Sequence, residues 1–295
     1  MDIAGLKIFL AVARTGSISR AAENLNCVQS NVTARIKQLE QQLGTALFRR
    51  MSKGVILTPS GNVLLEYAEK IIRLAREAEE AVTNQDGPKG KLFIGSMETT
   101  AAVRLPPLLS AYHRSFPEVE LNLMTGTSEE SLQRLLEFRI DGAFVAGDLA
   151  NDAVVAVRAF EEELVLVAPP GISSIDRIDC RKILVFRMGC SYRAQLEAWL
   201  RKTGRLPYQV IEFGSIEGII GCISAGMGIS ILPCSIVERP QHRGNCSVFG
   251  LPGEIGAMTT WFVRRSREKP GKAMQAFMEL ALPPLHGGQG PTLGG

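Results

Sequence analysis

The sequence predicts an α+α/β protein, in which a small helical domain and one long helix precede a larger α/β domain. Three observations predict this class. Residues 1–58 carry apolar positions at helical spacing that glycines interrupt. A heptad-like pattern then covers residues 59–84, and from residue 91 short apolar runs alternate with helical patterns. With 295 residues and 45% hydrophobic content, the chain can bury a sizeable core in more than one domain.

A helix-turn-helix pattern is predicted within residues 1–58. Gly16 ends a first helix, and Ser17 caps a short second helix that extends to Leu25. Asn26 ends the second helix, because asparagine tolerates a left-handed turn. A third helix is expected over residues 29–43. The side chains predicted to be buried between these helices are Leu6, Phe9, Leu10, Ala13, Ala21, Ala22, Val32, Ile36, Leu39 and Leu43.

The opposite face of the third helix is rich in amides, hydroxyls and cations at its N-terminal end. Amide side chains can bond adenine, arginine can bond guanine, and hydroxyls can bond phosphate. The alternative is the ordinary solvated polar face of a surface helix. The candidate DNA contacts on this helix are Gln29, Ser30, Asn31, Thr33 and Arg35.

A basic turn follows the third helix. Gly44 ends the helix, Leu47 and Phe48 are expected in the core, and residues 49–54 form a cationic turn before an apolar strand at 55–57. This is the layout of a winged helix, whose wing contacts the DNA backbone or the minor groove. Residues 1–60 carry eight basic and three acidic side chains, a net charge of +5, against 25 basic and 27 acidic in the remainder. The candidate wing contacts are Arg49, Arg50 and Lys53.

The long helix at 59–84 is predicted to be a linker that dimerises. Its apolar residues recur at alternating spacings of four and three for about three heptads, as in a coiled-coil seam. The alternative is an amphipathic helix packed on its own domain. A polar, glycine-containing break in the helical pattern begins at Asn84. Residues 85–90 of this break are predicted to form a hinge. The seam residues are Leu64, Ala68, Ile71, Ala75, Ala78 and Val82.

Residues 91–282 predict two α/β lobes with a parallel sheet. Lobe I is assigned to about residues 91–161 with 262–282, and lobe II to about 162–261. Two such lobes imply a cleft in which a small ligand binds. The glycine-rich tail at 283–295 is expected to be disordered. The expected strands are 91–95, 119–124, 142–147, 163–168, 182–186, 208–213, 229–232 and 258–264, and the expected helices are 104–115, 128–138, 191–202, 215–225 and 272–282.

In combination these features resemble the LysR-type transcriptional regulators over the chain to about residue 282. The resemblance rests on AAENL at 21–25, QSNVT at 29–33 with Ile36 and Leu39-Glu40 following, LGTALFRR at 43–50, LTPSG at 57–61, RIDGAF at 139–144 and GMGISILP at 226–233. It implies a winged helix-turn-helix, a dimerising linker helix, and a two-lobed effector-binding domain of the periplasmic-binding-protein type. It also implies tetramers that bend promoter DNA and respond to an effector in the cleft. One departure is at Ala34, where the family often has arginine. In this sequence the cation stands at the next position, Arg35.

Hydroxyl-bearing helix starts beside the cleft are the candidate effector contacts. Free backbone N–H groups and the helix dipole favour a carboxylate there, so the expected effector is a small acid. The alternative is that these residues only cap their helices. The resemblance favours Ser96, Thr99 and Thr127. The full candidate set is Ser96, Thr99, Thr100, Thr127, Ser128, Ser191 and Tyr192.

Neither an enzyme activity nor a metal or other cofactor is expected. His113, His242 and His286 are isolated, and the six cysteines include no C-x-x-C pair, so reduced, mostly buried thiols are expected. Cys190 precedes a helix close to Arg193, an arrangement that can lower a thiol pKa, although a buried structural thiol is the commoner case.

The chain has no run of about 18 apolar residues and no signal-peptide pattern at its start, so a cytoplasmic protein is expected. Two hypotheses from different classes follow. The first is a ligand-responsive, homo-oligomeric transcriptional regulator. The second is a cytoplasmic solute-binding protein whose N-terminal segment only oligomerises it. The basic wing and the lack of an export signal favour the first.

Overall fold

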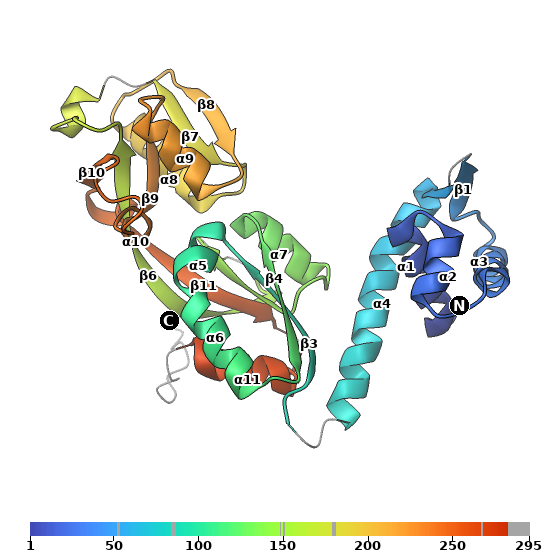
Figure 1. The fold of residues 1–295 in the computed structure, drawn as a ribbon. Coiled ribbons are helices and arrows are strands. Elements are labelled where there is room, and N and C mark those ends of the chain that lie inside the picture. The colour runs from blue at the N-terminus through green and yellow to red at the C-terminus, as the bar shows by residue number, and fades with distance from the viewer. Residues whose placement is uncertain are drawn as a thin grey trace, which may run out of the picture. The chain divides into compact units, whose positions relative to one another are not determined.

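The computed structural model describes residues 1–51, 54–83, 87–147, 149, 151–178, 181–266 and 268–282. Some expected features lie outside the described residues. They are Lys53, Cys180, residues 84–86 at the expected hinge, and the expected tail at 283–295. The described residues form two compact units (Figure 1). The N-terminal unit comprises the described part of residues 1–85, which includes the long helix, and residues 137–139, and the C-terminal unit is made of the rest.

The N-terminal unit is a winged helix-turn-helix followed by a long helix (Figure 1). Asn26 has a φ of +50°, so its expected left-handed turn is confirmed, and Gly44, with a φ of +66°, ends α3 as expected. The two short strands pair antiparallel, with Phe48 opposite Leu57. The elements are α1 (Ile3–Thr15), α2 (Ile18–Asn24), α3 (Gln29–Leu43), β1 (Phe48–Met51), β2 (Gly54–Leu57) and α4 (Pro59–Thr83).

The core of this unit forms where α1, α2, α3, the hairpin and the first half of α4 meet. Phe9 is fully buried, and its ring centroid lies 5.2 Å from that of Phe48. Two expected core residues are not buried. Leu43 is 41% exposed because it is the last residue of α3, and Ala13 is only half-buried, whereas Val12 is fully buried.

The expected seam of α4 is packed at its N-terminal end and exposed at its C-terminal end. Leu64, Ala68 and Ile71 pack against the core of the N-terminal unit, so the alternative interpretation is correct for these three. The exposed apolar side chains of α4 form a stripe that runs beside these three residues and joins the seam toward the C-terminal end of the helix. This α4 stripe consists of Val63, Tyr67, Leu74, Ala78 and Val82.

The C-terminal unit has two lobes that share β6 (Val154–Ala168). The N-terminal part of β6 pairs with β11 in lobe I, and its C-terminal part pairs with β9 and β10 in lobe II. Lobe I contains β3 (Gly90–Ser96), α5 (Glu98–Val103), α6 (Leu105–Ser115), β4 (Val119–Thr125), α7 (Ser128–Leu136), β5 (Gly142–Ala146), β11 (Ala257–Arg265) and α11 (Lys272–Ala281). Lobe II contains β7 (Lys182–Phe186), α8 (Ser191–Lys202), β8 (Gln209–Phe213), α9 (Ile216–Ser224), β9 (Ser230–Pro233), α10 (Cys234–Val237) and β10 (Ser247–Gly250), with short 3-10 turns at Ile175–Arg177 and Gly253–Ile255.

The expectation of a parallel sheet is correct for only some of the strands. β3 pairs parallel with β4 and β5, and β7 pairs parallel with β8. β11 pairs antiparallel with both β5 and β6, and β9 and β10 pair antiparallel with β6. The sheet is therefore mixed, and the antiparallel strands are the ones that connect the lobes. The first half of β6, α5, α10 and β10 were not expected from the sequence.

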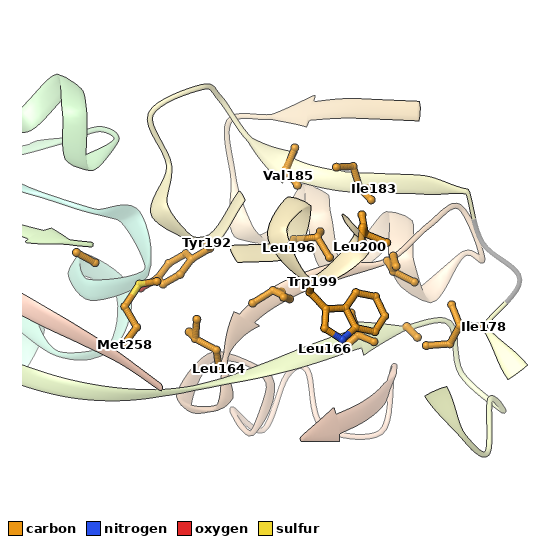
Figure 2. Packing of buried hydrophobic residues seen from close by; sticks show 14 of the residues in the cluster. Leu164, Leu166, Ile178, Ile183, Val185, Tyr192, Leu196, Trp199, Leu200 and Met258 are labelled. Carbon is orange, nitrogen blue, oxygen red and sulfur yellow. The ribbon is translucent and has the colours of Figure 1, made fainter. Parts of the chain in front are cut away.

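Each lobe buries apolar side chains on both faces of its sheet. Lobe I has an aromatic cluster in which Phe144 lies 5.0 Å from Phe262 between ring centroids. In lobe II, Leu196, Trp199 and Leu200 of α8 pack over strand residues, and Tyr192 lies beside Met258 at the edge of the cluster (Figure 2). Tyr192 is thereby held at the boundary between the lobes.

Candidate nucleic-acid interface and ligand cavity

The N-terminal half of α3 presents polar side chains to solvent. Gln29, Ser30 and Asn31 are exposed, and Thr33 is half-buried. The Ser19 hydroxyl on α2 donates to Gln29 Oε1 at 3.3 Å, and Thr33 Oγ1 donates to the Gln29 carbonyl at 3.0 Å. Because the other side of α3 is anchored in the core, these four side chains form one outward surface with the donors and acceptors needed to read base edges.

Arg35 lies on the flank of this surface. Its Nη1 is 3.4 Å from Asp2 Oδ2 and 3.3 Å from Gln38 Oε1, and its side chain is 40% exposed. The other carboxylate oxygen of Asp2 caps α1 by accepting the Gly5 N–H at 2.6 Å. An exposed ion pair of this kind contributes only about 0–1 kcal/mol, so a DNA phosphate can replace Asp2 as the partner of Arg35.

The base of the wing is held by Glu40 of α3. Its Oε1 accepts the backbone N–H groups of Leu47 at 2.8 Å and Phe48 at 3.2 Å. Thr58 closes the other side, because its hydroxyl donates to the Ala46 carbonyl at 2.7 Å and its N–H donates to the Leu47 carbonyl at 2.9 Å. The recognition helix and the wing are therefore coupled through hydrogen bonds that do not involve DNA.

The two described wing arginines leave the hairpin on opposite faces. Arg49 pairs with the exposed Ile56 and Arg50 with the buried Val55, and successive residues of a strand point to opposite sides. Both arginines are exposed. The first residue of β2, Gly54, has a φ of +100° and no room for a side chain, since a Cβ would lie 2.4 Å from the Gly16 carbonyl oxygen.

A cavity of about 80 Å³ lies between the two lobes of the C-terminal unit. Its lobe I wall comes from the turns after β3 and β4, and its lobe II wall comes from the ends of β7 and β8 and the start of α8. Both polar and apolar residues line it. The lining residues are Met97, Glu98, Thr99, Thr125, Gly126, Thr127, Ser128, Phe186, Arg187, Cys190, Tyr192, Phe213 and Gly214.

Four candidate effector residues form hydrogen bonds that bridge the two lobes. The hydroxyls of Thr99 and Tyr192 lie 3.1 Å apart. Ser191 Oγ donates to the Ala146 carbonyl at 2.5 Å and lies 3.3 Å from Ser128 Oγ. Burial raises the pKa of Tyr192 above its ordinary value, which further favours the neutral phenol. These hydroxyls therefore join the two lobes through hydrogen bonds.

The other three candidates have local partners or none. Thr127 Oγ1 accepts the Glu130 N–H at 3.1 Å while Glu130 accepts the Thr127 N–H at 3.1 Å, which is a capping box. Ser96 is fully buried and donates to the Met97 carbonyl, and buried Thr100 Oγ1 has no partner among the described residues. The cavity wall thus includes Thr99, Thr127, Ser128 and Tyr192. It does not include Ser96, Thr100 or Ser191, and Ser191 lines a separate open groove of about 570 Å³.

Glu98 and Arg187 are the charged residues of the cavity wall, and neither was a candidate from the sequence. Glu98 is the first residue of α5, where an acidic residue is common in any helix, so its position carried no specific signal. Arg187 follows β7 directly and shares its strand end with the lining residue Phe186. Arg187 could have been found by considering strand ends in lobe II as well as hydroxyls.

Cys190 lines the cavity but does not have the properties of a reactive thiol. Burial raises its pKa, and this effect outweighs the opposing contributions of the Arg193 and Tyr192 N–H groups and of the Arg193 charge. The described cysteines are free and half-buried, so the expectation that they are mostly buried is only partly met. The described residues contain no group of three or more potential ligands placed to hold a metal ion, and none of the described helices could cross a bilayer.

Comparisons with known proteins cover nearly the whole chain. The model "Bacterial regulatory helix-turn-helix protein, lysR family" matches residues 3–62, and the model "LysR substrate binding domain" matches residues 85–283. The chain is 45% identical over 281 residues to the HTH-type transcriptional regulator GltR of Bacillus subtilis. The aligned region covers 94% of this chain and 95% of GltR. It is 39% identical over 279 residues to the HTH-type transcriptional regulator SoxR of an Arthrobacter species, with 95% and 96% covered.

Two solved structures share the fold over 95% of this chain. Full-length CbnR complexed with its target DNA superposes with a TM-score of 0.71 at 24% identity, over 99% of that chain. A full-length OxyR from Pseudomonas aeruginosa gives a TM-score of 0.71 at 22% identity, over 93% of that chain. At these identities the likeness concerns the fold alone.

Proposed function

The chain belongs to the LysR family of bacterial DNA-binding transcriptional regulators, and on this premise we propose that the polar face of α3 and the β1–β2 wing make its promoter contacts. Gln29, Ser30, Asn31 and Thr33 read bases in the major groove, while Arg35 and the wing arginines bind phosphates. A regulator of bacterial promoters works where the chromosome is, so the cytoplasm is the proposed location.

The observation that carries this proposal is the coupling of an exposed amide and hydroxyl surface on α3 to a basic wing through Glu40. In the alternative, a solute-binding protein, the N-terminal segment would only oligomerise the chain and would not require that arrangement. The match of the helix-turn-helix family model to residues 3–62 also argues against this alternative. The relatives named above are regulators, which supports a role without catalysis.

The interlobe cavity is the proposed effector site. A small acid that enters it must compete with the Thr99–Tyr192 hydrogen bond, which joins the lobes. Binding therefore shifts the equilibrium between a conformation with the lobes closed and one with the lobes further apart. The size of the shift equals the difference in the effector's binding free energy for the two conformations. That change is the proposed signal to the DNA-binding units.

The α4 stripe is the proposed dimer contact. Val63, Tyr67, Leu74 and Val82 are each more than half exposed, and large apolar side chains in one line on a helix favour pairing with an identical helix. A dimer places two recognition helices on half-sites separated by helical turns of about 10 bp. The family resemblance extends this to a tetramer built from two such dimers.

The test of the DNA contacts is promoter binding by Gln29→Ala and Thr33→Ala, with Gln42→Ala as the matched control. Gln42 is an exposed amide at the far end of the same helix. Loss of a good base contact costs about 1–3 kcal/mol, so we expect roughly 5- to 150-fold weaker binding in an electrophoretic mobility shift assay. Unchanged affinity in both variants, with an unchanged circular dichroism spectrum, would show that α3 does not read the promoter.

A further inference from the structure

Glu98 is a half-buried carboxylate in the cavity wall with no cationic partner among the described residues. Its Oε1 accepts the N–H of Ile216, the first residue of α9 in lobe II, at 3.1 Å. Glu217 adds a second negative charge nearby, and burial raises the pKa of Glu98. A carboxylate has about four acceptor sites, so Glu98 retains capacity to accept bonds from a ligand.

Arg187 brings positive charge to the same cavity from lobe II. Its Nη1 lies 3.5 Å from Glu130 Oε1, and its side chain is 61% exposed. A guanidinium has five N–H donors in a planar fork that suits a carboxylate, and this long contact to Glu130 uses only one of them. Arg187 can therefore hold a ligand carboxylate while Glu130 remains nearby.

The remaining wall limits the size of the ligand. Phe186, Phe213 and Met97 contribute apolar surface, and Tyr192 stays neutral. The cavity measures about 80 Å³. A dry cavity of about 150 Å³ takes up benzene, so this one suits a smaller molecule unless the lobes open.

We infer that the effector is a small amino acid whose ammonium group binds Glu98 and whose carboxylate binds Arg187. This inference rests on the proposed function, because it assigns the ligand class of the proposed effector site. A simple carboxylic acid would place its charge in a cavity that already contains Glu98 with Glu217 close by, and like charges repel. An ammonium group instead neutralises Glu98, and the opposite charges at the two walls orient the ligand.

The experiment is a calorimetric titration of the full-length protein with each of the twenty proteinogenic L-amino acids. Every amino acid that binds is then compared with its deaminated acid and its decarboxylated amine. We expect at least one amino acid to bind, and its deaminated acid to bind at least about tenfold more weakly, because a charge-assisted hydrogen bond is lost. Glu98→Gln should reduce amino-acid affinity by a similar factor, while Glu118→Gln, which removes an exposed carboxylate from the same lobe, should not.

Several results would overturn the inference. One is that none of the twenty amino acids binds. Another is that the deaminated acid binds as tightly as the amino acid or more tightly, and a third is that Glu98→Gln leaves the amino-acid affinity unchanged. If a deaminated acid binds and alters promoter affinity, the proposed function stands and only the ligand class is wrong. If the wild-type protein does not bind promoter DNA under any condition, the proposed function itself fails. Should Glu98→Gln not fold, the comparison of ligands on the wild-type protein still decides the question.

Discussion

Glu40→Ala should weaken the N-terminal unit and its DNA binding together. The substitution removes the acceptor for two backbone N–H groups, those of Leu47 and Phe48, and Leu47 is only 1% exposed. A hydrogen bond to a charged group contributes about 1.5–3 kcal/mol, and because Glu40 is itself half-buried we take about 2–3 kcal/mol for the pair. In a unit of this size, that corresponds to a fall of roughly 8–20 °C in Tm.

The assay is differential scanning calorimetry of the full-length protein, with hydrogen exchange of the Phe48–Leu57 hairpin as a local readout. Glu40→Gln keeps one carbonyl oxygen and should show about half the effect, since neutral hydrogen bonds are weaker than charged ones. Glu23→Ala makes the same change in net charge at an exposed position of α2 and is the control. It should leave hairpin exchange unchanged and leave promoter affinity equal or higher. If Glu40→Ala and Glu23→Ala behave alike, Glu40 does not hold the wing.

Two further predictions concern other parts of the molecule. Tyr67→Asp places a charge in the exposed α4 stripe, so sedimentation velocity should show a shift from dimer toward monomer. The control, Lys91→Asp in the C-terminal unit, should leave the dimer unchanged. A dimer that is also unchanged in Tyr67→Asp would exclude the stripe as the dimer contact. Burial lowers the pKa of His242, so the unfolded chain binds more protons and the free energy of unfolding should fall as the pH drops below about 6.5. Urea titrations at pH 7.5 and 5.5 should show that His242→Gln lessens this loss relative to His113→Gln, and an equal loss in both would contradict the reasoning.

Local features of the chain could be predicted well from the sequence. Asn26 and Gly44 end their helices as expected, because the backbone conformation at a helix end depends mainly on the residue that adopts it. The strand Lys182–Phe186 and the helix Ser191–Lys202 have the expected bounds, since both carry a clear apolar pattern between polar breaks. The wing was recognisable for the same reason.

Features that depend on distant packing could not be predicted. The first half of β6 has mixed polar and half-buried residues, and it becomes a strand because β11 pairs with it from about 100 residues further along the chain. On α4, the heptad pattern alone could not decide that Ala68 faces the core and Tyr67 faces solvent. Only the packing of α1 against α4 settles which stripe is buried.

The candidate ligand site shows the same division. The sequence placed hydroxyls at the helix starts beside the cleft, and Thr99, Thr127, Ser128 and Tyr192 do line the cavity. Ser96 was a poor candidate because its side chain points into the core at the end of β3, which spacing alone could not indicate. Glu98 was missed because its significance comes from α9 of the other lobe, 118 residues away in the chain.

The most direct test of the central claim is the salt dependence of promoter binding. Fluorescence anisotropy would measure the affinity of the wild-type protein, Arg49→Ala and Arg50→Ala for a duplex from the region upstream of the gene, between 50 and 300 mM salt. Each phosphate contact contributes about 0.9 to the slope of log K against log salt concentration. We therefore expect the slope to become shallower by about this amount in at least one of the two variants. If both variants keep the wild-type slope and affinity, the β1–β2 hairpin is not a DNA-binding wing.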